Sequence, residues 1–437
     1  MGLSEARPLV RIVGGGVAGI ASAIAHLELG YRVEVLEARD RLGGRAWSKD
    51  GVDNATHVIL GCYDAFRRVL RALETEGRFF VPKGLRLTWL DEDGVVHRLE
   101  AAARFGPLGM LAGILRLHTV PWSTRLGLLR AGRLAMRGGA TAGEDVTQWL
   151  AREGVAPRVR SLLFEPLCRA IMNQEPEHAS AELFAATLRI AFTSGARGLA
   201  MWVPAAAWQD ILGDAAARYF NEHSVRVNLR ARAKRIEVDG SRVALRMADG
   251  RRLDDHDRLV LAVPWHVAAA LDADSDLVVE APRLRGVPML GLHVDLDADD
   301  LPCEDAVIAF ENGQPFHFIC RRPHPDGSLQ TSVPACLVAG AAYPLDGLRQ
   351  SQIVELGLAQ LARFTRRKRP FAERTRRTAR VVRESNATLD HACKGLERPR
   401  PGPTLHPSLW LAGDWTDVGL PSTLEGAARS GFVALER

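Results

Sequence analysis

The sequence predicts an α/β fold in which a parallel sheet is assembled from segments that lie far apart in the chain. Three features support this prediction: a strand, glycine turn and helix near the N-terminus, a run of short strands after residue 225, and a strand followed by a helix near the C-terminus. Strands that alternate with helices are typical of parallel sheets. Because 437 residues are many for one hydrophobic core, we expect two closely packed domains.

A strand, a glycine-rich turn and a helix follow one another near the N-terminus. The apolar residues 9–13 lead into Gly14, Gly16 and Gly19, and residues 17–29 carry apolar side chains at helical spacing. Gly14 permits the tight turn, and Gly16 lets a pyrophosphate group approach the backbone N–H groups at the start of the helix. Gly19 lets the helix pack closely on the strand. The pattern predicts a βαβ unit that binds a nucleotide.

The next strand and turn extend this nucleotide site. Residues 32–36 are predicted to form a second strand, and Glu37 at its end can accept hydrogen bonds from a ribose hydroxyl group. In the glycine turn that follows, at residues 41–45, the backbone can approach a ligand and the arginines can pair with phosphate. The residues that we assign to the site here are Arg41, Gly43, Gly44 and Arg45. Because a nicotinamide enzyme has no need of this second turn, the combination indicates a different dinucleotide.

The C-terminal region supplies the other half of the predicted site. Residues 409–414 are predicted to form a buried strand that ends in Gly413 and Asp414, and an acid at a strand end can bind a ribityl chain or a pyrophosphate group. A helix starts after Pro421, and its N-terminus can stabilise negative charge at the N1 and O2 edge of a flavin. The residues assigned here to the cofactor are Gly413, Asp414, Thr423, Leu424 and Glu425. We therefore predict FAD, bound without a covalent link because no cysteine lies in this motif.

Between residues 225 and 264 the sequence changes to short strands. The predicted strands are residues 227–229, 233–238, 243–247 and 259–264. The pairs Asp239-Gly240 and Asp249-Gly250 are hairpin turn signals. We predict a β-meander inserted into the nucleotide-binding sheet, with Ala233 at its start contributing to the cofactor site.

Taken together, these motifs resemble those of the FAD-dependent amine oxidase and phytoene desaturase superfamily. At finer grain the whole chain is similar to the hydroxysqualene dehydroxylase family, the squalene-associated FAD-dependent desaturases of bacterial hopanoid pathways. The segments that carry the finer resemblance are 41–45, 53–63, 145–150, 165–168, Asn173, 179–181 and 412–427. The resemblance implies reductive removal of an allylic hydroxyl group from hydroxysqualene to give squalene, with hydride transfer from flavin N5 to an allylic cation.

The predicted organisation is discontinuous. An FAD-binding Rossmann-like domain of the GR2 type, with the inserted β-meander, alternates with a mixed α+β substrate domain that has a helical cap. The three FAD-binding parts are residues 1–63, 216–270 and 396–437. Residues 64–215 form the mainly helical substrate or cap region, and residues 271–395 form the sheet and helices of the substrate domain.

Three side chains are candidates for the acid, or for a polar group that orients the substrate. Asp53 and His57 lie in a polar loop, and the equivalent loop in the superfamily lies beside the isoalloxazine ring. A turn with a capping Asp is the competing interpretation of this loop. Glu165 is a charge within an apolar helix and needs a partner if it is buried, so pairing with an arginine competes with a general-acid role.

Two segments have the composition of membrane-contacting surfaces. Residues 105–115 are nearly uncharged and residues 117–134 carry leucines between basic residues, which is typical of an interfacial helix or of an ordinary helix packed on its own domain. The arginine-rich residues 363–380 are typical of a solvated face, with lipid headgroup contact as the sharper alternative. No stretch reaches the ~18 apolar residues that a spanning helix needs.

The net charge, the cysteines and the N-terminal residues indicate which partners and which cellular compartment to expect. The net charge of +5 is small for this length and no nucleic-acid module accompanies it, so we expect no nucleic-acid partner. The six cysteines are scattered, which predicts reduced thiols and no metal site. With no apolar leader before Arg11 we expect a cytoplasmic protein, or one peripheral to the inner face of the cytoplasmic membrane. The expected partners are a long isoprenoid substrate and a separate flavin reductant.

Three other functions share the predicted architecture. Flavin amine oxidases typically place a lysine near flavin N5 and frame the substrate with aromatic side chains, whereas this chain has no lysine between Lys234 and Lys368 and no tyrosine after Tyr343. A carotenoid or phytoene-type desaturase needs a similarly apolar site. A prenyl-lipid carrier of the same fold needs no catalysis, and the intact glycine turns favour an enzyme over a carrier.

Overall fold

The computed structural model describes residues 7–54, 56–239, 242–272, 278, 281–331, 333–392 and 397–435, and it has the predicted α/β fold. Its first sheet has six strands in the order β10-β2-β1-β14-β21-β20. The strands are β1 (Leu9–Val13), β2 (Arg32–Leu36), β10 (Arg226–Asn228), β14 (Arg258–Leu261), β20 (Gly402–Pro403) and β21 (Leu409–Leu411). Neighbouring strands pair in parallel, except β20 with β21. One sheet therefore unites three distant parts of the chain.

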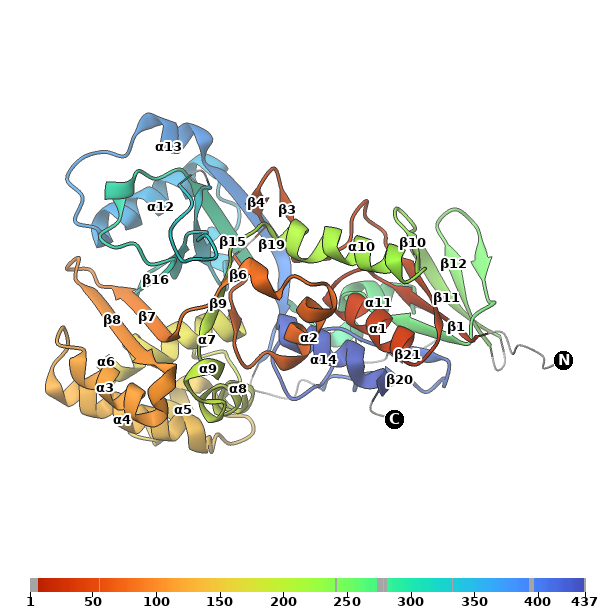
Figure 1. The fold of residues 1–437 in the computed structure, drawn as a ribbon, viewed down its shortest axis with the longest axis horizontal. Coiled ribbons are helices and arrows are strands. Elements are labelled where there is room, and N and C mark those ends of the chain that lie inside the picture. The colour runs from red at the N-terminus through yellow and green to blue at the C-terminus, as the bar shows by residue number, and fades with distance from the viewer. Residues whose placement is uncertain are drawn as a thin grey trace.

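The helices that follow the two glycine-containing motifs pack on each other beside this sheet. α1 (Val17–Glu28) lies along α14 (Leu424–Phe432), and α2 (Asp64–Ala72) contacts both (Figure 1). A Cβ atom added to Gly431 of α14 would lie 2.5 Å from the carbonyl oxygen of Ala18 in α1. Glycine at this position therefore permits the close approach of the two helices. α10 (Asp214–Glu222) contacts the edge strand β10.

The predicted β-meander is present as a separate antiparallel sheet. It contains β11 (Ala233–Asp239), β12 (Arg242–Met247) and β13 (Arg252–Leu253), and the chain then enters β14 of the first sheet. Gly250 has a φ of +90° in the second predicted turn, whereas Gly240 of the first lies outside the described residues. α11 (Trp265–Leu271) packs against β11.

A second large sheet has seven strands in the order β19-β15-β18-β17-β16-β7-β8. The strands are β7 (Gly84–Leu90), β8 (Val96–Ala102), β15 (Gly286–Val294), β16 (Val307–Phe310), β17 (Phe318–Cys320), β18 (Ala335–Ala339) and β19 (Arg380–Leu389). α12 (Gln350–Phe364) and α13 (Glu373–Thr378) lie against this sheet at the end opposite the helical cap (Figure 1). Leu358 and Leu361 of α12 share a hydrophobic core with Leu290 and Leu337 of the sheet. This sheet is the floor of the substrate domain.

Strands β7 and β8 differ from the mainly helical character expected for residues 64–215. In β8 the side chains of His97, Leu99 and Ala101 are buried, whereas those of Arg98 and Glu100 are exposed. This alternation of burial is the period-two pattern of a half-buried strand. Residues 64–215 therefore contribute the β7–β8 hairpin to the substrate-domain sheet.

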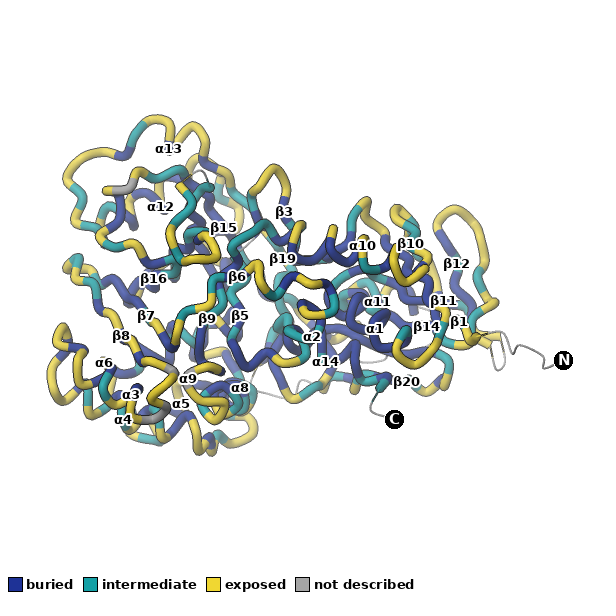
Figure 2. Tube along the Cα trace, viewed as in Figure 1, coloured by how far each residue is buried: buried dark blue, intermediate teal, exposed yellow. Residues whose placement is uncertain are grey.

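A layer of helices forms the cap, at the far end of the molecule from the β-meander (Figure 1). It contains α3 (Gly106–Arg116), α4 (Trp122–Arg137), α5 (Val146–Arg152), α6 (Pro157–Val159), α7 (Glu165–Met172), α8 (Ala181–Thr193) and α9 (Gly195–Gly198). Figure 2 shows exposed backbone along α3 and α4. The remaining strands are short: β3 (Ser48–Lys49) pairs with β4 (Val52–Asp53), and β9 (Met201–Pro204) pairs with β5 (Ile59–Leu60) and β6 (Phe79–Phe80). Within the described ranges, no helix combines the length and the apolar character needed to cross a membrane.

Candidate functional site

A cavity of about 500 Å³ is lined by residues from both large sheets. Val13, Leu36 and Gly413 line it at or just after the carboxyl ends of the parallel strands β1, β2 and β21. Met289 and Thr388 line it from β15 and β19 of the other sheet. Open α/β sheets bind ligands at the carboxyl ends of their strands, and the volume falls in the usual range for small-molecule and cofactor sites.

The two predicted glycine turns meet at this cavity. Gly14, Gly16, Gly43 and Gly44 all line it, and a Cβ atom added to Gly44 would lie 2.9 Å from the Cα atom of Gly16. Gly19 is outside the lining; a Cβ atom there would lie 1.9 Å from the carbonyl oxygen of Gly14, so this glycine serves the close helix packing that the sequence predicts. The bare backbone at the N-terminus of α1 fits a pyrophosphate group.

Glu37 lies at the end of β2, as predicted. Its buried carboxylate accepts hydrogen bonds from the backbone N–H groups of Gly15 and Arg39, both at 2.7 Å. It lines the cavity together with residues 231–233, which include the predicted Ala233. Because a carboxylate has about four lone-pair sites, two accepted bonds leave capacity for ribose hydroxyl groups. This end of the cavity fits an adenosine group.

Arg45 joins the first motif to the last. Its Nη2 donates to Oδ1 of Asp414, and its Nη1 donates to the carbonyl oxygen of Ala387 at 2.8 Å. Arg45 and Asp414 both line the cavity, as does the predicted Gly413. The structure therefore brings together the cofactor residues that the sequence assigns to opposite ends of the chain.

The start of α14 divides its predicted residues between two roles. Thr423 and Leu424 line the cavity, and Thr423 is the N-cap of the helix. Glu425 is outside the lining: its buried carboxylate accepts from the backbone N–H of Phe66 at 2.9 Å and from Nε of Arg429 at 3.0 Å. Burial raises the pKa of Glu425. This carboxylate caps α2, because its position one residue into the helix turns it away from the cavity, so the geometry does not support its assignment to the cofactor.

Arg41 is also outside the cavity lining. Its guanidinium group lies over the ring of Trp47, 4.4 Å from the ring centroid. Arg39 lines the cavity instead, and its Nη1 donates to the carbonyl oxygen of Gly44 at 2.9 Å. Sequence reasoning missed Arg39, although its position two residues after Glu37 is a signal that could have identified it.

Asp53 lies outside the cavity and is held by structural contacts. Its Oδ2 pairs with Nη2 of Arg322 at 2.8 Å, and its Oδ1 accepts from the backbone N–H of Trp208 at 3.1 Å and from the hydroxyl group of Ser48. Both carboxylate oxygens of Asp53 are therefore engaged by protein groups outside the cavity. The geometry supports a positioning role in place of the acid role considered from the sequence.

Glu165 is the first residue of α7 and is likewise outside the cavity lining. Its Oε2 lies 3.7 Å from Nη1 of Arg169, which is the arginine pairing considered as an alternative to a catalytic role. Burial raises the pKa of Glu165, and Arg169 opposes this shift. The geometry supports the structural pairing.

Among the three catalytic candidates, all within the described residues, only His57 lines the cavity. Its ring meets the ring of Trp208 edge to face, with the ring centroids 5.4 Å apart. Asp53 holds the backbone of Trp208, so Asp53 positions His57 through this tryptophan. The loop that the sequence singled out therefore reaches the cavity through one of its two candidate side chains.

Asn173 and Thr388 form a polar contact in the cavity wall that sequence reasoning did not assign to the site. Nδ2 of Asn173 donates to Oγ1 of Thr388 at 3.0 Å, and both residues line the cavity. Oδ1 of Asn173 accepts from the backbone N–H of Ala341 at 3.1 Å. Asn173 ends α7 with a φ of +53°, a left-handed conformation that asparagine tolerates. An asparagine directly after a helix was the available signal.

A second cavity of about 60 Å³ adjoins the first at Ile171, which lines both. Its walls are otherwise almost wholly apolar side chains from the cap and from β7 and β8. Met110 and Ile114 contribute from α3, and Leu128 contributes from α4. Ile171 is therefore a wall shared by the larger cavity and an apolar pocket under the cap helices.

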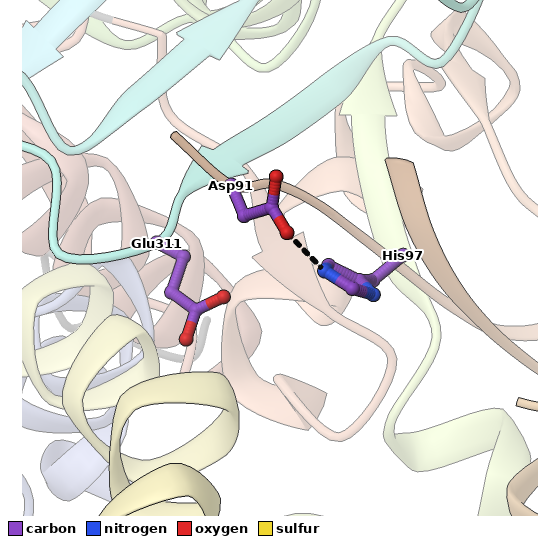
Figure 3. A group of neighbouring side chains, drawn as sticks. All are labelled: Asp91, His97 and Glu311. Carbon is purple, nitrogen blue, oxygen red and sulfur yellow. Dashed lines mark hydrogen bonds and ion pairs between the residues drawn. The ribbon is translucent and has the colours of Figure 1, made fainter. Parts of the chain in front are cut away.

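Asp91, His97 and Glu311 form a separate cluster at the end of the β7–β8 hairpin (Figure 3). Their ligand atoms lie within 4.8 Å of one another. Nε2 of His97 is 2.9 Å from Oδ2 of Asp91, whose other oxygen accepts two backbone N–H groups. The carboxylate of Glu311 pairs with Arg158. Asp91 is thus satisfied, and Oε1 of Glu311 accepts from Arg158 and Ser161, whereas Oε2 of Glu311 is buried without a hydrogen-bond partner among the described residues. We interpret the pairing of Asp91 with His97 as a structural contact of the hairpin.

Comparison with known proteins identifies the group to which this site belongs. Residues 17–434 match the model of the flavin containing amine oxidoreductase family. The chain is 25% identical to the hydroxysqualene dehydroxylase of Zymomonas mobilis, with 98% of each chain covered. It is 25% identical to the 15-cis-phytoene desaturase of Solanum lycopersicum over 67% of this chain and 53% of that protein.

A solved structure shows the same fold over the whole chain. An oxidoreductase from Methanosarcina mazei superposes with a TM-score of 0.73 at 14% identity, covering 98% of this chain and 100% of that chain. The family match spans nearly the whole chain, and the family name implies a flavin cofactor. The protein therefore belongs to the flavin containing amine oxidoreductase family and is a flavin-dependent oxidoreductase.

Proposed function

We propose that this protein is an FAD-dependent enzyme that reductively removes the hydroxyl group of hydroxysqualene to give squalene. The observation that carries the proposal is an apolar pocket that lies directly behind the cofactor cavity and shares Ile171 with it as a wall. A long isoprenoid needs apolar side chains close to the reacting group, and this pocket supplies them. Full-length similarity to relatives named hydroxysqualene dehydroxylase supports this substrate over other isoprenoids.

The extent of the cavity supports FAD over a shorter flavin. The lining runs from Glu37 and residues 231–233 at the adenosine end to Thr388 at the other end, so it offers contacts to both halves of a dinucleotide. Non-covalent binding is part of the proposal, because none of the five cysteines that the structure describes lines the cavity. Cys393 lies outside the described residues.

The reaction needs one proton and one hydride. The C–O bond of the alcohol breaks and its hydroxyl group leaves with the proton as water, while a hydride forms the new C–H bond. When bound, reduced FAD supplies the hydride, and a separate two-electron donor reduces it again. We assign the role of proton donor to His57, the candidate side chain that lines the cavity. Trp208 and Asp53 orient the ring of His57.

The residues of the apolar pocket exclude water from the reacting carbon. A cation formed during loss of the hydroxyl group would react with water, so its lifetime depends on a dry site. Leu163, Leu167 and Ile171 separate the cofactor cavity from the cap interior and present apolar side chains. The described pocket of about 60 Å³ holds only part of a thirty-carbon chain, so binding requires the cap helices to move apart.

The direct test is anaerobic incubation of the photoreduced holoenzyme with hydroxysqualene, followed by mass analysis of the products. We expect squalene in an amount equal to the flavin that is reoxidised. Failure to form squalene, with turnover of phytoene or of a primary amine instead, would replace the assignment with a desaturase or an amine oxidase. A colourless protein that FAD does not stabilise would indicate a lipid carrier.

His57→Asn tests the proton donor. We expect a loss of about 10² to 10⁴ in the rate of flavin reoxidation by hydroxysqualene, the usual contribution of general acid catalysis. The flavin absorbance spectrum should stay unchanged. His266→Asn is the matched control, because His266 is a second histidine in the cavity lining and is exposed. Equal loss in both variants would argue against a specific role for His57.

We place this reaction in the cytoplasm, at the inner face of the membrane that holds the isoprenoid. The arginine-rich composition supports that location without a membrane-spanning helix. Separation of a cell lysate into soluble and membrane fractions at low and high salt tests it. We expect recovery with membranes at low salt and release at high salt.

A further inference from the structure

We propose that the outer faces of α3 and α4 form a docking surface for a bilayer of anionic phospholipid, hereafter the α3–α4 surface. It comprises the exposed side chains of residues 104–137 that point away from the apolar pocket. The observations are exposed apolar side chains, an uninterrupted positive charge, and the apolar pocket directly behind the two helices.

Large apolar side chains are exposed along both helices. The set comprises Phe105, Leu108, Leu111, Leu115, Trp122 and Leu126, with Leu108 72% and Trp122 63% exposed. Contiguous exposed apolar residues of this kind mark interaction sites with proteins or membranes. An interfacial helix places leucine and aromatic side chains in the acyl region and basic side chains at the headgroups.

The same segment carries only positive charge. Residues 101–143 contain six arginines and neither aspartate nor glutamate. Of these, Arg116, Arg130 and Arg133 form no ion pair with any residue that the structure describes. Basic side chains near an anionic leaflet are attracted to it, and the attraction is screened by salt. The charge favours an anionic bilayer over a neutral surface.

The two helices turn opposite faces to the pocket and to solvent. Met110 and Ile114 of α3 line the apolar pocket, while Leu108 and Leu115 of the same helix are exposed. In α4, Leu128 lines the pocket while Trp122 and Leu126 are exposed. With 3.6 residues per turn these sets lie on opposite sides of each helix. The α3–α4 surface is therefore the outer wall of the pocket.

The arginine-rich run 363–380 is the competing basic surface, and its charges are largely compensated. Five of its arginines pair with acids of the chain: Arg363 with Glu92, Arg366 with Asp93, Arg367 with Asp300, Arg374 with Asp297 and Arg376 with Glu355. Compensated charges attract an anionic leaflet weakly. The structure thus favours the α3–α4 surface over the run that looked more basic in the sequence.

A bilayer fits this surface better than a second copy of the chain. Two copies docked through the same patch would bring like charges together, because Arg137 pairs with Glu153 but Arg116, Arg130 and Arg133 form no ion pair with any described residue. The use of docking as a route for isoprenoid into the pocket rests on the proposed function. The docking itself does not depend on it.

The test is co-sedimentation of the flavin-loaded protein with two kinds of vesicle. One kind is pure phosphatidylcholine, and in the other one-third of the lipid is phosphatidylglycerol. We expect binding to the anionic vesicles to be at least tenfold stronger and to fall with added salt. The variants L108E/W122E and R130E/R133E should each weaken it at least tenfold. L405E and R369E/R377E are matched controls, because Leu405 is 85% exposed elsewhere on the surface and Arg369 and Arg377 lie in the compensated run. We expect the controls to bind within twofold of the parent protein.

Several outcomes would overturn the docking proposal. The first is equal binding to neutral and anionic vesicles. The second is loss of binding in the control R369E/R377E alone. The third is a protein that binds no vesicles but forms a dimer in sedimentation velocity, which L108E/W122E disrupts. Squalene formation in detergent micelles separates this proposal from the enzymatic one. Vesicle binding without squalene formation would overturn only the enzymatic proposal, and squalene formation without vesicle binding would overturn only the docking proposal.

Discussion

Asp53 and Arg322 form a buried ion pair, in which Nη2 of Arg322 lies 2.8 Å from Oδ2 of Asp53. The side chain of Asp53 is 6% exposed and that of Arg322 is 10% exposed. Asp53 ends the β3–β4 hairpin that follows the second glycine turn, whereas Arg322 follows strand β17 of the substrate-domain sheet. The pair therefore links the two domains beside the cofactor cavity. It also explains why the polar loop that contains Asp53 and His57 contributes only His57 to the cavity, whereas Asp53 takes part in the contact between the domains.

Asp53→Asn should lower the free energy of unfolding by about 3–5 kcal/mol, because it leaves the Arg322 guanidinium buried and unpaired. Urea unfolding followed by fluorescence measures the change. Asp93→Asn is the control, since Asp93 and Arg366 form an exposed pair and its loss should cost at most about 1 kcal/mol. A similar cost for both variants would contradict the structural role of the buried pair.

Glu37→Arg should weaken FAD retention by at least about tenfold, because it removes the carboxylate from the adenosine end of the cavity and adds a like-charged group beside Arg39. Glu37→Gln keeps an acceptor for the Gly15 N–H and should lose less. Flavin release followed by its fluorescence measures the effect. Glu304→Arg makes the same charge change at an exposed residue and should leave flavin retention unchanged. If Glu37→Arg also retains its flavin, Glu37 is not a ribose ligand.

Gly44→Ala should weaken FAD binding more than it destabilises the fold. Its new Cβ atom would lie 2.9 Å from the Cα atom of Gly16, so the two glycine turns must separate. Gly30→Ala is a close control, because Gly30 also has a positive φ (+84°) but has open space around it. We expect each variant to lose about 1 kcal/mol of unfolding free energy from the backbone conformation, Gly44→Ala to lose more because of the contact with Gly16, and Gly44→Ala alone to lose flavin affinity. Titration of the apoprotein with FAD distinguishes them.

His391 should make the protein less stable in acid. Burial, assisted by nearby Arg398, lowers the pKa of His391 to about 3, whereas an unfolded histidine has a pKa of about 6.5. Between these two pKa values His391 is protonated in the unfolded state and neutral in the folded state. The free energy of unfolding therefore falls by up to about 1.4 kcal/mol per pH unit as pH falls from about 6.5 toward 3.

His391→Gln tests this prediction while it keeps an acceptor for the Ser422 N–H, which donates to Nε2 of His391 at 2.7 Å. The difference in unfolding free energy between parent and variant should shrink as pH falls below about 6.5. Other buried histidines titrate in both proteins and cancel in this difference. Parallel stability curves from pH 7.5 to pH 4.5 would contradict the assignment.

The sequence was most informative where local rules and the fold agree. The glycine positions at 14, 16 and 44 and the acid at Glu37 follow from backbone geometry, so their place in the cavity could be predicted. The β-meander that returns to the buried strand β14 followed from the turn signals at residues 239–240 and 249–250. The domain boundaries drawn from the sequence stay a prediction.

The sequence was less informative where a side chain's direction decides its role. Glu425 and Thr423 are two residues apart, yet one caps α2 and the other lines the cavity, and only the packing of α14 on α2 sets this difference. Likewise Arg39, which was not predicted, lines the cavity, whereas the predicted Arg41 lies over Trp47. The hairpin β7–β8 joins strands from distant parts of the chain, and such non-local pairing leaves no local signal of its partner.

The pairing of β21 with β14 has a consequence for how the protein is made. Residues that line the cofactor cavity near the start of the chain, such as Gly14 and Arg45, leave the ribosome long before Asp414 and Leu424. Because β21 completes the sheet beside β14 and α14 lies along α1, the cavity has no complete wall until residue 432 has been synthesised. Flavin can therefore meet a complete cavity only after β21 and α14 have been synthesised.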